Sequence, residues 1–403
     1  MPKLLSEEIF DVGIIGGGIA GCGIARDAAL RGLRVVLFEK KTFGSGTSSK
    51  SSKLIHGGIR YLDLAWQAAK SGRFSEAWKN FRFVTVSLRE SRILERIAPD
   101  LVKPISLTIP IYKSSGRSVW SVYFGILFYS FLAFLAGNFR LPKIFLTARS
   151  ILKRIPHLNP EGLQGGVMIW DHTTADKQLV KETIESAVKT GAKAFEHAEV
   201  LNYRYQSERK IYEVDFQLNG ETRMCLARRL VNASGPWVDR VRAAAGEKKE
   251  DFLVPVAGSH IILKRFLDSS VILEAEDERI FFVIHNGETS RVGTTERLHD
   301  DPDHLEPEEK EVDYLLRSLK HYFPALDFRK EDILSKEAGI RPLARPANAV
   351  SPHEISREHE IRIGPTGVIH VLGVKLTDHR RAASEVVNFI TGNRKTLTHL
   401  TPL

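Results

Sequence analysis

Hydrophobic and polar positions change their spacing several times along the chain, and the first forty residues show this most clearly. The apolar run 10–15 leads into the glycines of GGGIAG, and an alanine-rich helical pattern covers 20–30. A second apolar run occupies 33–38. A strand, a helix and a second buried strand in this order predict a β-α-β unit, which implies a parallel sheet with helices on its faces.

Helical and strand-like spacing alternate through the rest of the chain. Helices are predicted at 75–97, 177–190, 307–322 and 377–390. Strands are predicted at 105–112, 200–205, 211–218, 224–230, 253–263, 271–273, 280–284 and 291–295, then up to Ile340 and twice around Gly367. Asn219-Gly220 predicts a hairpin turn between two of these runs. The later strands indicate a separate antiparallel sheet, so the expected class is α/β at the N-terminus and α+β overall.

Composition places the chain among ordinary globular proteins. It has 403 residues, of which 43% are hydrophobic and 27% charged. This length and apolar content favour two domains and exclude disorder, collagen and a disulfide mini-fold. Cys22 and Cys225 lie in no metal-binding spacing, so no metal site is expected, and a reducing compartment fits them. The first ten residues lack the apolar segment of a secretory signal, which favours folding in the cytosol.

The excess of positive charge favours binding of anions but does not indicate which kind of anion. Lys and Arg number 58 against 49 Asp and Glu, a formal net charge of +9. Phosphates, anionic lipid and nucleic acid all suit such a surface. Nucleic acid is not an expected partner, because the chain contains no recognised binding module or arginine-rich helix.

The uncharged stretch 118–139 is the strongest membrane signal. It is rich in aromatic residues and is flanked by Lys113, Arg117, Arg140 and Lys143. As a helix it would reach about 33 Å, enough to cross a bilayer. A helix buried in the protein and a helix lying in the membrane surface are the alternatives, and we favour the surface helix because Trp and Tyr suit the interface.

The most informative motif is Gly16-x-Gly18-x-x-Gly21 between the first strand and helix. Glu39 stands at the end of the second strand. Glycines let a pyrophosphate approach the helix N-terminus, and the acid accepts from a ribose hydroxyl. The motif predicts dinucleotide binding, disfavours NADP and leaves NAD and FAD open.

Two further segments are ambiguous by themselves. The strand-to-helix junction 230–237 (LVNASGPW) can bring backbone close to a cofactor, or it can be an ordinary turn. The loop 44–53 (GSGTSSKSSK) offers hydroxyls and amides to a phosphate, although such loops are more often merely solvated.

Taken together, these segments resemble one family, the FAD-dependent glycerol-3-phosphate dehydrogenases of the D-amino-acid-oxidase-like flavoproteins. The matching stretches are 11–40, TSSKSSKLIHGGIRYL (47–62), LVNASGPWVD (230–239), GSHIIL (258–263), VGTTE (292–296), GIRPL (339–343) and VLGVKLTDHR (371–380). The resemblance spans nearly the whole chain, and the segment 47–62 is its most specific part.

The resemblance implies oxidation of sn-glycerol 3-phosphate to dihydroxyacetone phosphate, with hydride passing to FAD and then electrons to quinone or oxygen. The implied cofactor-binding residues are Gly16, Gly18, Gly21, Glu39, Lys40, Thr47, Ser48, Ser52, Leu54, Ala233, Gly235, Gly373, Val374, Leu376 and Thr377. The implied substrate-binding residues are Arg60, Tyr61, Arg341 and Lys375.

Physical chemistry supports these roles. A phosphate dianion suits the guanidinium forks of Arg60 and Arg341. Lys375 can polarise the C2 oxygen or stabilise a reduced flavin. His56 and His260 are the candidates to accept the C2 hydroxyl proton, because imidazole titrates near neutral pH.

The implied domain division is discontinuous. Residues 1–100, 150–250 and 340–403 are expected to form a Rossmann-like FAD-binding domain, and 101–149 with 251–339 an interleaved substrate domain that includes the helix 118–139. In the family, a helical domain usually follows the FAD-binding domain, and it is not expected within residues 1–403.

One departure from the family's sequence bears on which substrate is expected. The family turn Gly-Gly-Lys-Leu-Thr reads Gly373-Val374-Lys375-Leu376-Thr377 here, and valine resists positive φ. An oxidase or dehydrogenase of another small anionic 2-hydroxy acid or amino acid therefore stays open, as does a flavin-binding membrane protein without turnover. The expected location is cytoplasmic, at the inner face of the membrane. Monomer and homodimer are both left open.

Overall fold

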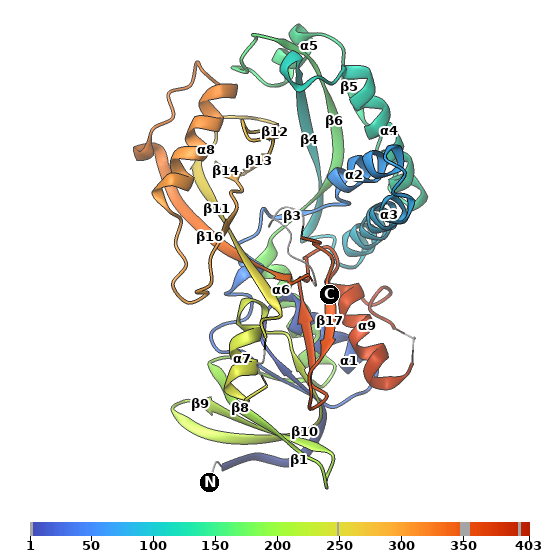
Figure 1. The fold of residues 1–403 in the computed structure, drawn as a ribbon, viewed down its shortest axis with the longest axis vertical. Helices are drawn as coiled ribbons and strands as arrows, with labels where there is room; N and C mark the ends of the chain where they lie inside the picture. Colours follow the sequence, from blue (N-terminus) through green and yellow to red (C-terminus); the bar gives the residue numbers. More distant parts are fainter. Residues whose placement is uncertain (1–2, 248–249, 347–354, 394–395) are drawn as a thin grey trace.

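Two sheets organise the protein (Figure 1). The computed structural model describes residues 3–247, 250–346, 355–393 and 396–403. The sheet in the lower half of Figure 1 has the order β17-β18-β10-β1-β2-β7. These strands are β17 (Glu360–Ile363), β18 (Ile369–Leu372), β10 (Glu221–Asn232), β1 (Lys3–Ile15), β2 (Val35–Phe38) and β7 (Lys193–Phe195). β8 (Ala198–Gln206) and β9 (Ile211–Leu218) continue from β10 as an antiparallel meander.

The predicted β-α-β unit is confirmed. β1 and β2 pair in parallel, from Val12 opposite Val35 to Ile15 opposite Phe38, with α1 (Ile19–Leu30) between them. Ten of the twelve α1 residues are buried, because α6 (Asp176–Lys189) and α9 (His379–Thr391) pack on either side of this helix. These three helices and the strands beneath them form one apolar core.

The second sheet has the order β15-β11-β14-β13-β12-β4-β6-β3, with β16 paired to β11 and β5 to β6. Its strands are β3 (Leu54–Ile55), β4 (Val102–Tyr112), β5 (Lys143–Phe145), β6 (Leu163–Thr174), β11 (Leu253–Lys264), β12 (Ser270–Glu274), β13 (Ile280–Asn286), β14 (Thr289–Gly293), β15 (Arg297–Leu298) and β16 (Ile333–Ala344). This sheet is mostly antiparallel, as expected, although β12 and β4 run parallel. α8 (Glu309–Tyr322) packs against β11 and closes a second core.

The sheets divide the chain differently from the expected domains at β6 and at β3, which pairs with it. Residues 150–250 were expected beside the parallel sheet, but β6 pairs with β4 in the second sheet, from Val102 opposite Thr174 to Tyr112 opposite Leu163. The apolar pattern of β6 could not show this, because it says that a strand is buried and not which strand is its neighbour.

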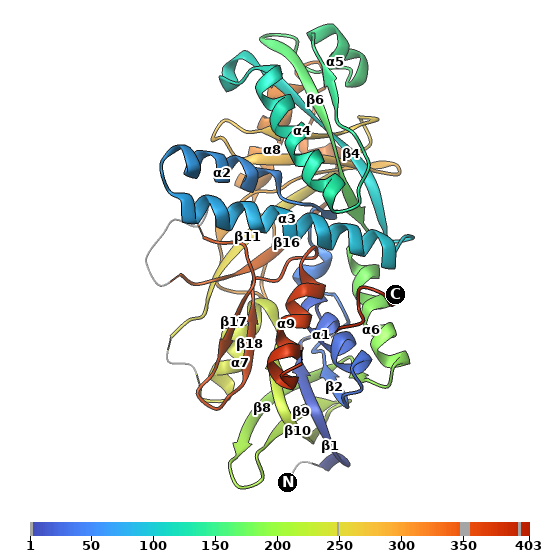
Figure 2. The ribbon, with the colours of Figure 1, turned by 90° about the vertical axis from the view of Figure 1, so that its right-hand side faces the viewer.

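A layer of helices covers the outer side of β4 and β6 (Figure 2). It consists of α2 (Ile59–Lys70), α3 (Phe74–Ile97) and α4 (Val119–Leu135), with the short α5 (Ala148–Arg154) beyond them. The prediction of α3 is confirmed, whereas α2 was not predicted.

The apolar stretch 118–139 forms α4, a helix of 17 residues with two different faces. Tyr129 is fully buried against the second sheet, whereas Phe124 is 59% exposed. Among the described residues, no helix combines the length and the apolar character that crossing a bilayer requires.

Candidate active site

An elongated cavity of about 810 Å³ lies where the two sheets meet. The carboxyl ends of β1, β2, β10 and β18 point to one edge of the parallel sheet, which is where ligands bind in open α/β folds. The sequence-predicted residues that line the cavity are Gly16, Gly18, Glu39, Lys40, Thr47, Ser48, Ser52, Leu54, His56, Arg60, Tyr61, Ala233, Gly235, His260, Arg341, Gly373, Val374, Lys375, Leu376 and Thr377. The structure therefore brings together side chains from seven separate stretches of sequence.

Gly21 is the one predicted site residue that does not line the cavity. A Cβ at this position would lie 1.9 Å from the carbonyl oxygen of Gly16. Gly21 therefore allows α1 to pack closely against the turn that follows β1, and the expected cofactor contact is replaced by a packing role.

The glycine-rich turn forms one end of the cavity. Gly17 donates its backbone N–H to Glu39 Oε2 over 2.7 Å, and the N–H of Lys41 donates to Oε1 over 2.8 Å. These bonds hold the carboxylate at the mouth of the turn, where an acid is suited to a ribose hydroxyl. The Lys40 ammonium forms an exposed ion pair with Glu199, at 2.9 Å.

The loop 44–53 forms the next part of the wall. Ser48 Oγ accepts from the N–H of Ile19 at the start of α1, over 3.0 Å, and Thr47 Oγ1 donates to the carbonyl of Ile340 over 2.6 Å. The hydroxyls thus lie between a helix N-terminus and β16, a place that favours phosphate.

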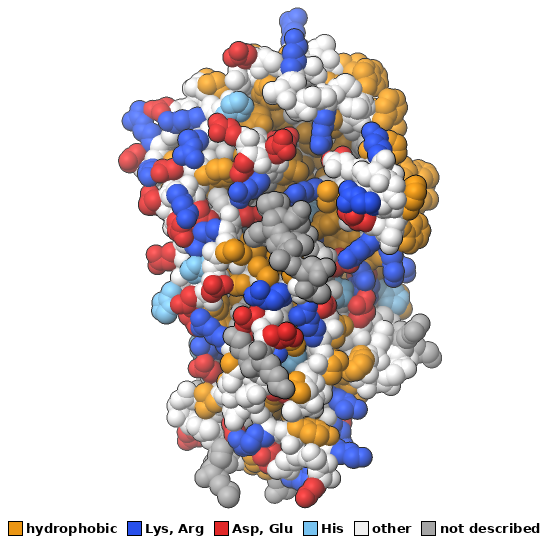
Figure 3. Space-filling model, in the orientation of Figure 1, with side chains coloured by type: hydrophobic (Ala, Val, Ile, Leu, Met, Phe, Trp, Pro, Cys, Tyr) orange, Lys and Arg blue, Asp and Glu red, His pale blue; other side chains and the backbone are white. Residues whose placement is uncertain are grey.

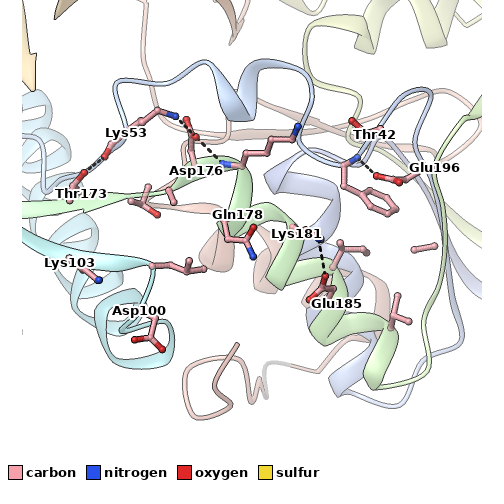
Figure 4. A pocket seen from close by; sticks show the side chains of 18 of the residues that line it. Thr42, Lys53, Asp100, Lys103, Thr173, Asp176, Gln178, Lys181, Glu185 and Glu196 are labelled. Atoms are coloured by element: carbon pink, nitrogen blue, oxygen red, sulfur yellow. Dashed lines mark hydrogen bonds and ion pairs between the residues drawn. The ribbon is translucent and has the colours of Figure 1, made fainter. Parts of the chain in front are cut away.

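Lys53 ends this loop but faces a different hollow, of about 1180 Å³, behind it (Figure 4). Its ammonium forms an ion pair with Asp176 at 2.6 Å, and its carbonyl accepts from Thr173. This pairing, together with the hydrogen bond from the Ser51 hydroxyl to Asp176 Oδ2 at 2.8 Å, ties the loop to the start of α6.

Two guanidinium groups form a candidate anion site at the other end of the cavity. Arg341 Nη1 lies 3.3 Å from Glu296 Oε1, and its Nη2 donates to Thr294 Oγ1 over 3.2 Å. The Arg357 guanidinium also pairs with Glu296 Oε1. One carboxylate oxygen therefore lies between two arginines, in a place that a phosphate or carboxylate can take. Arg60, expected to share this role with Arg341, is exposed at the cavity wall.

Lys375 lies between this anion site and two aromatic rings. Its Nζ is 4.3 Å from the centroid of the Phe83 ring and 5.0 Å from that of Tyr61. Burial lowers the pKa of Lys375 to about 7; the Asp378 carboxylate opposes this shift and the Arg357 guanidinium adds to it. An ammonium that is this weakly solvated interacts strongly with negative charge nearby.

Both predicted histidines line the cavity as neutral imidazoles. Burial, together with the charges of Lys375 and Arg357, lowers the pKa of His56 to about 4. Burial also lowers the pKa of His260 well below its usual value. His260 Nε2 lies 3.0 Å from Ser52 Oγ, and its buried Nδ1 has no hydrogen-bond partner among the described residues. Each imidazole is free of a proton on one nitrogen at neutral pH.

The substitution of valine in the last turn is accommodated by the backbone. The positive φ of this turn, +68°, belongs to Gly373, and Val374 does not have a positive φ. Its side chain packs against the core of the parallel sheet. Valine at residue 374 therefore meets no positive φ, because the position of this turn that has one is still glycine.

The polar residues of the cavity that sequence reasoning missed include Arg357, Glu296 and Asp171. Arg357 belongs to no local pattern in the sequence. Asp171 is hidden inside a buried strand, where its isolated charge was the available signal.

The cavity fits a flavin dinucleotide. Gly16 and Gly18 line the cavity at the start of α1, where backbone N–H groups suit a pyrophosphate. Gly17 between them packs against Phe43, because a Cβ there would lie 2.6 Å from that ring. Neutral histidines, a lysine and paired arginines line the same cavity. This combination defines the class of dinucleotide-dependent oxidoreductases with a separate substrate-binding sheet.

Comparison with known proteins narrows this class. Residues 11–376 match the family described as FAD dependent oxidoreductase, and the chain belongs to this family. It is 33% identical over 403 residues to an aerobic glycerol-3-phosphate dehydrogenase of Staphylococcus saprophyticus, covering 98% of this chain and 69% of that protein. The corresponding enzyme of Bacillus subtilis is 31% identical, with coverage of 97% and 68%.

Comparison with solved structures finds similar proteins. A glycerol-3-phosphate dehydrogenase of Bacillus halodurans in complex with FAD superimposes with a TM-score of 0.75 at 28% identity, over 96% of this chain and 65% of that one. The chain thus spans about two thirds of the length of these relatives. An L-α-glycerophosphate oxidase of Mycoplasma pneumoniae, 19% identical with a TM-score of 0.68 over 95% of each chain, shares the fold.

Proposed function

We propose that the protein oxidises sn-glycerol 3-phosphate to dihydroxyacetone phosphate with FAD. The observation that carries this proposal is the pair Arg341 and Arg357 on the single carboxylate of Glu296, beside Lys375. A phosphate dianion matches two guanidiniums and an ammonium better than a monoanionic amino-acid carboxylate does. The names of the relatives support the same substrate.

The residues divide the work by place. Gly16, Gly18, Glu39, Thr47 and Ser48 would hold the nucleotide and pyrophosphate part of FAD, and the turn 373–377 would lie at its reactive end. When bound, FAD accepts the hydride that leaves C2 of the substrate.

At the substrate end of the cavity, side chains of this protein bind and position the substrate. Arg341 and Arg357 bind the phosphate and so place C2 in one position. We assign the C2 hydroxyl proton to His56, which is neutral, because His260 Nε2 already lies within hydrogen-bond distance of Ser52. The ammonium form of Lys375, present below its pKa of about 7, would stabilise the oxygen that becomes the ketone. Loss of hydride and proton leaves dihydroxyacetone phosphate.

Anaerobic addition of glycerol 3-phosphate to the purified protein with FAD tests this function. Bleaching of the flavin band, at roughly 450 nm, is the expected result. Lactate and glycine serve as matched carboxylate substrates and should leave the band unchanged. Bleaching by a carboxylate alone would favour the 2-hydroxy-acid or amino-acid alternative. A bound flavin that no substrate reduces would favour a protein without turnover.

We also propose that the enzyme lies on the inner membrane surface through one apolar face, which we call the aromatic face. It combines Trp66 of α2 and Phe74 and Trp78 of α3 with Trp120, Phe124, Phe128, Phe131, Phe134 and Leu135 of α4, and each of these side chains is at least 46% exposed. Apolar side chains gather along the corresponding edge in the upper half of Figure 3. Such a contiguous exposed surface is unusual for a protein that meets only water.

Ring contacts and charge support this placement. The Phe81 ring bridges Trp78, at 5.8 Å, and Phe128, at 6.4 Å, so α3 and α4 share the aromatic face. Basic side chains surround it: Lys70, Arg73, Lys79, Arg82, Arg117 and Lys143 are exposed. Aromatic residues enter the interface while lysine and arginine bind anionic head groups. A quinone acceptor would be within reach there, although oxygen stays the alternative.

A triple variant tests the membrane proposal. Deleting 118–139 would remove the buried Tyr129 and Leu132 from the core, so substitution of exposed positions is sharper. We expect Phe124→Ser, Phe131→Ser and Leu135→Ser together to lower binding to phosphatidylglycerol-containing vesicles at least about tenfold, because three large apolar side chains no longer leave water.

The control changes equally exposed residues elsewhere, with Leu298→Ser, Leu334→Ser and Phe389→Ser. This variant should sediment with vesicles like the unchanged protein. Equal binding by both triple variants would overturn the membrane proposal, whatever the activity.

A further inference from the structure

A buried tyrosine and a buried aspartate join helix α4 to the turn that presents the substrate-site residues. Tyr129, on the inner face of α4, is fully buried, and Asp171, in β6, is 5% exposed. The hydroxyl of Tyr129 donates to the Asp171 carboxylate, with O–O distances of 3.1 and 3.2 Å. Neither residue has a part in the mechanism above, and both would be expensive to bury without a role or a partner.

Both side chains bind the same backbone group. The N–H of Gly57 donates to Tyr129 Oη over 3.0 Å and also lies 3.3 Å from Asp171 Oδ1. Three groups from three separate elements therefore form a closed triangle. A Cβ at residue 57 would lie 2.4 Å from Tyr129 Oη and 2.5 Å from Leu88 Cδ2, so the backbone is held directly against the tyrosine.

The peptide at Gly57 lies between the two halves of the substrate site. His56, the assigned proton acceptor, precedes it, and Gly58, with φ of +75°, follows it as the N-cap residue of α2. The first turn of α2 carries Arg60 and Tyr61, which line the same cavity. Movement of Gly57 would thus displace the proton acceptor and the substrate-site side chains together.

The charge of Asp171 depends on the same two donors. Burial raises the pKa of Asp171 to about 7, and the Gly57 N–H and the Tyr129 hydroxyl oppose this shift. These two bonds offset the cost of burying the carboxylate, and their loss would weaken the hold on the turn.

We infer that Tyr129 and Asp171 are positioning residues that hold the turn 56–61 and connect its geometry to the seating of α4. This inference rests on the proposed function for its kinetic consequence. The physical connection itself, through Gly57, is independent of the substrate. Because the outer surface of α4 belongs to the aromatic face, contact of that face with lipid would act on the substrate site through this triangle.

The test is Tyr129→Phe in the full-length protein loaded with FAD. Removing the hydroxyl should speed amide hydrogen exchange in a peptide covering 54–62, because Gly57 loses an acceptor. Flavin content should not change. kcat/KM for glycerol 3-phosphate should fall about ten- to a hundredfold, with kcat affected as well as KM, because misplacing a reacting group by about 1 Å costs up to this much.

Tyr112→Phe is the matched control. Tyr112 is also largely buried in the second sheet, and its hydroxyl donates to the carbonyl of Asn159 over 2.9 Å, remote in sequence from the turn. This variant loses one hydrogen bond of the same kind and should keep the exchange at 54–62 and kcat/KM within about twofold of the unchanged protein. Should Tyr129→Phe not fold, Asp171→Asn replaces it, since it removes the charged acceptor while keeping its size.

The outcomes separate the inference from the proposed function. Unchanged exchange at 54–62 in Tyr129→Phe, or an equal change in Tyr112→Phe, overturns the positioning role. If the unchanged protein is not reduced by glycerol 3-phosphate, the proposed function fails. The exchange measurements then decide the inference alone.

Discussion

Replacing Arg341 with alanine is expected to lower kcat/KM for glycerol 3-phosphate by about 100-fold. The variant removes one of two guanidiniums that meet at Glu296 and are the proposed phosphate site. A lost charge-assisted hydrogen bond to a poorly solvated anion costs roughly 2 to 3 kcal/mol, which is about two decades in rate constant. Steady-state turnover with a dye acceptor measures it. Most of the loss should appear in KM, because the phosphate is bound equally before and during the reaction.

Two variants control for charge and for geometry. Arg329→Ala removes an equal charge from an exposed arginine paired with Asp327, just before the start of β16, and should leave turnover unchanged. Arg341→Lys keeps the charge without the fork and should recover only part of the loss. A wild-type KM in Arg341→Ala, at normal flavin content, would remove Arg341 from the substrate site.

Replacing Lys375 with methionine is expected to reduce kcat by about 100- to 1000-fold. The ammonium is enclosed beside Tyr61 and Phe83, where water screens it poorly, and removing a preorganised charge from a reacting oxygen has an effect of this size. Methionine keeps much of the shape of the side chain. Lys336→Met is the control and should be fully active. Lys336 lies in β16 and pairs with Glu309 of α8.

The pH profile decides which form of Lys375 is needed. With a pKa of about 7, the charged form is complete below this pH and is lost as the pH rises through it. If the ammonium is the active form, kcat/KM should fall above pH 7 with a slope approaching tenfold per pH unit. Lys375→Arg, whose guanidinium stays charged, should lose this falling limb. A limb that rises instead would make Lys375 a base.

Local patterns predicted the cofactor end of the molecule well. The strand before Gly16, the helix after Gly18 and the strand before Glu39 are each continuous segments, and the structure confirms all three. The reason is that a β-α-β unit is built from neighbours in the chain, so its residues and spacing report it directly.

Predictions became weaker where residues distant in sequence meet. The helix α2 begins directly after the glycine pair Gly57-Gly58, and its moderate apolar content did not indicate a helix. The pairing of β6 with β4 was missed for a related reason, since a buried strand does not identify its neighbour. The sequence could not show that the positive φ of the turn 373–377 belongs to Gly373 and not to Val374.

The sequence by itself thus determined the fold class, the dinucleotide turn with Glu39 and the presence of an apolar helix near residue 126, because each depends on spacing within one segment. Only the tertiary structure decided that Arg357 joins Arg341 at Glu296 and that Tyr129 of α4 meets Asp171 at Gly57. Glu296 follows β14, and Arg341 lies in β16; both strands pair with β11, so this strand brings the two residues together. Long-range pairing of strands and helices creates such contacts, and no local period in the sequence encodes them.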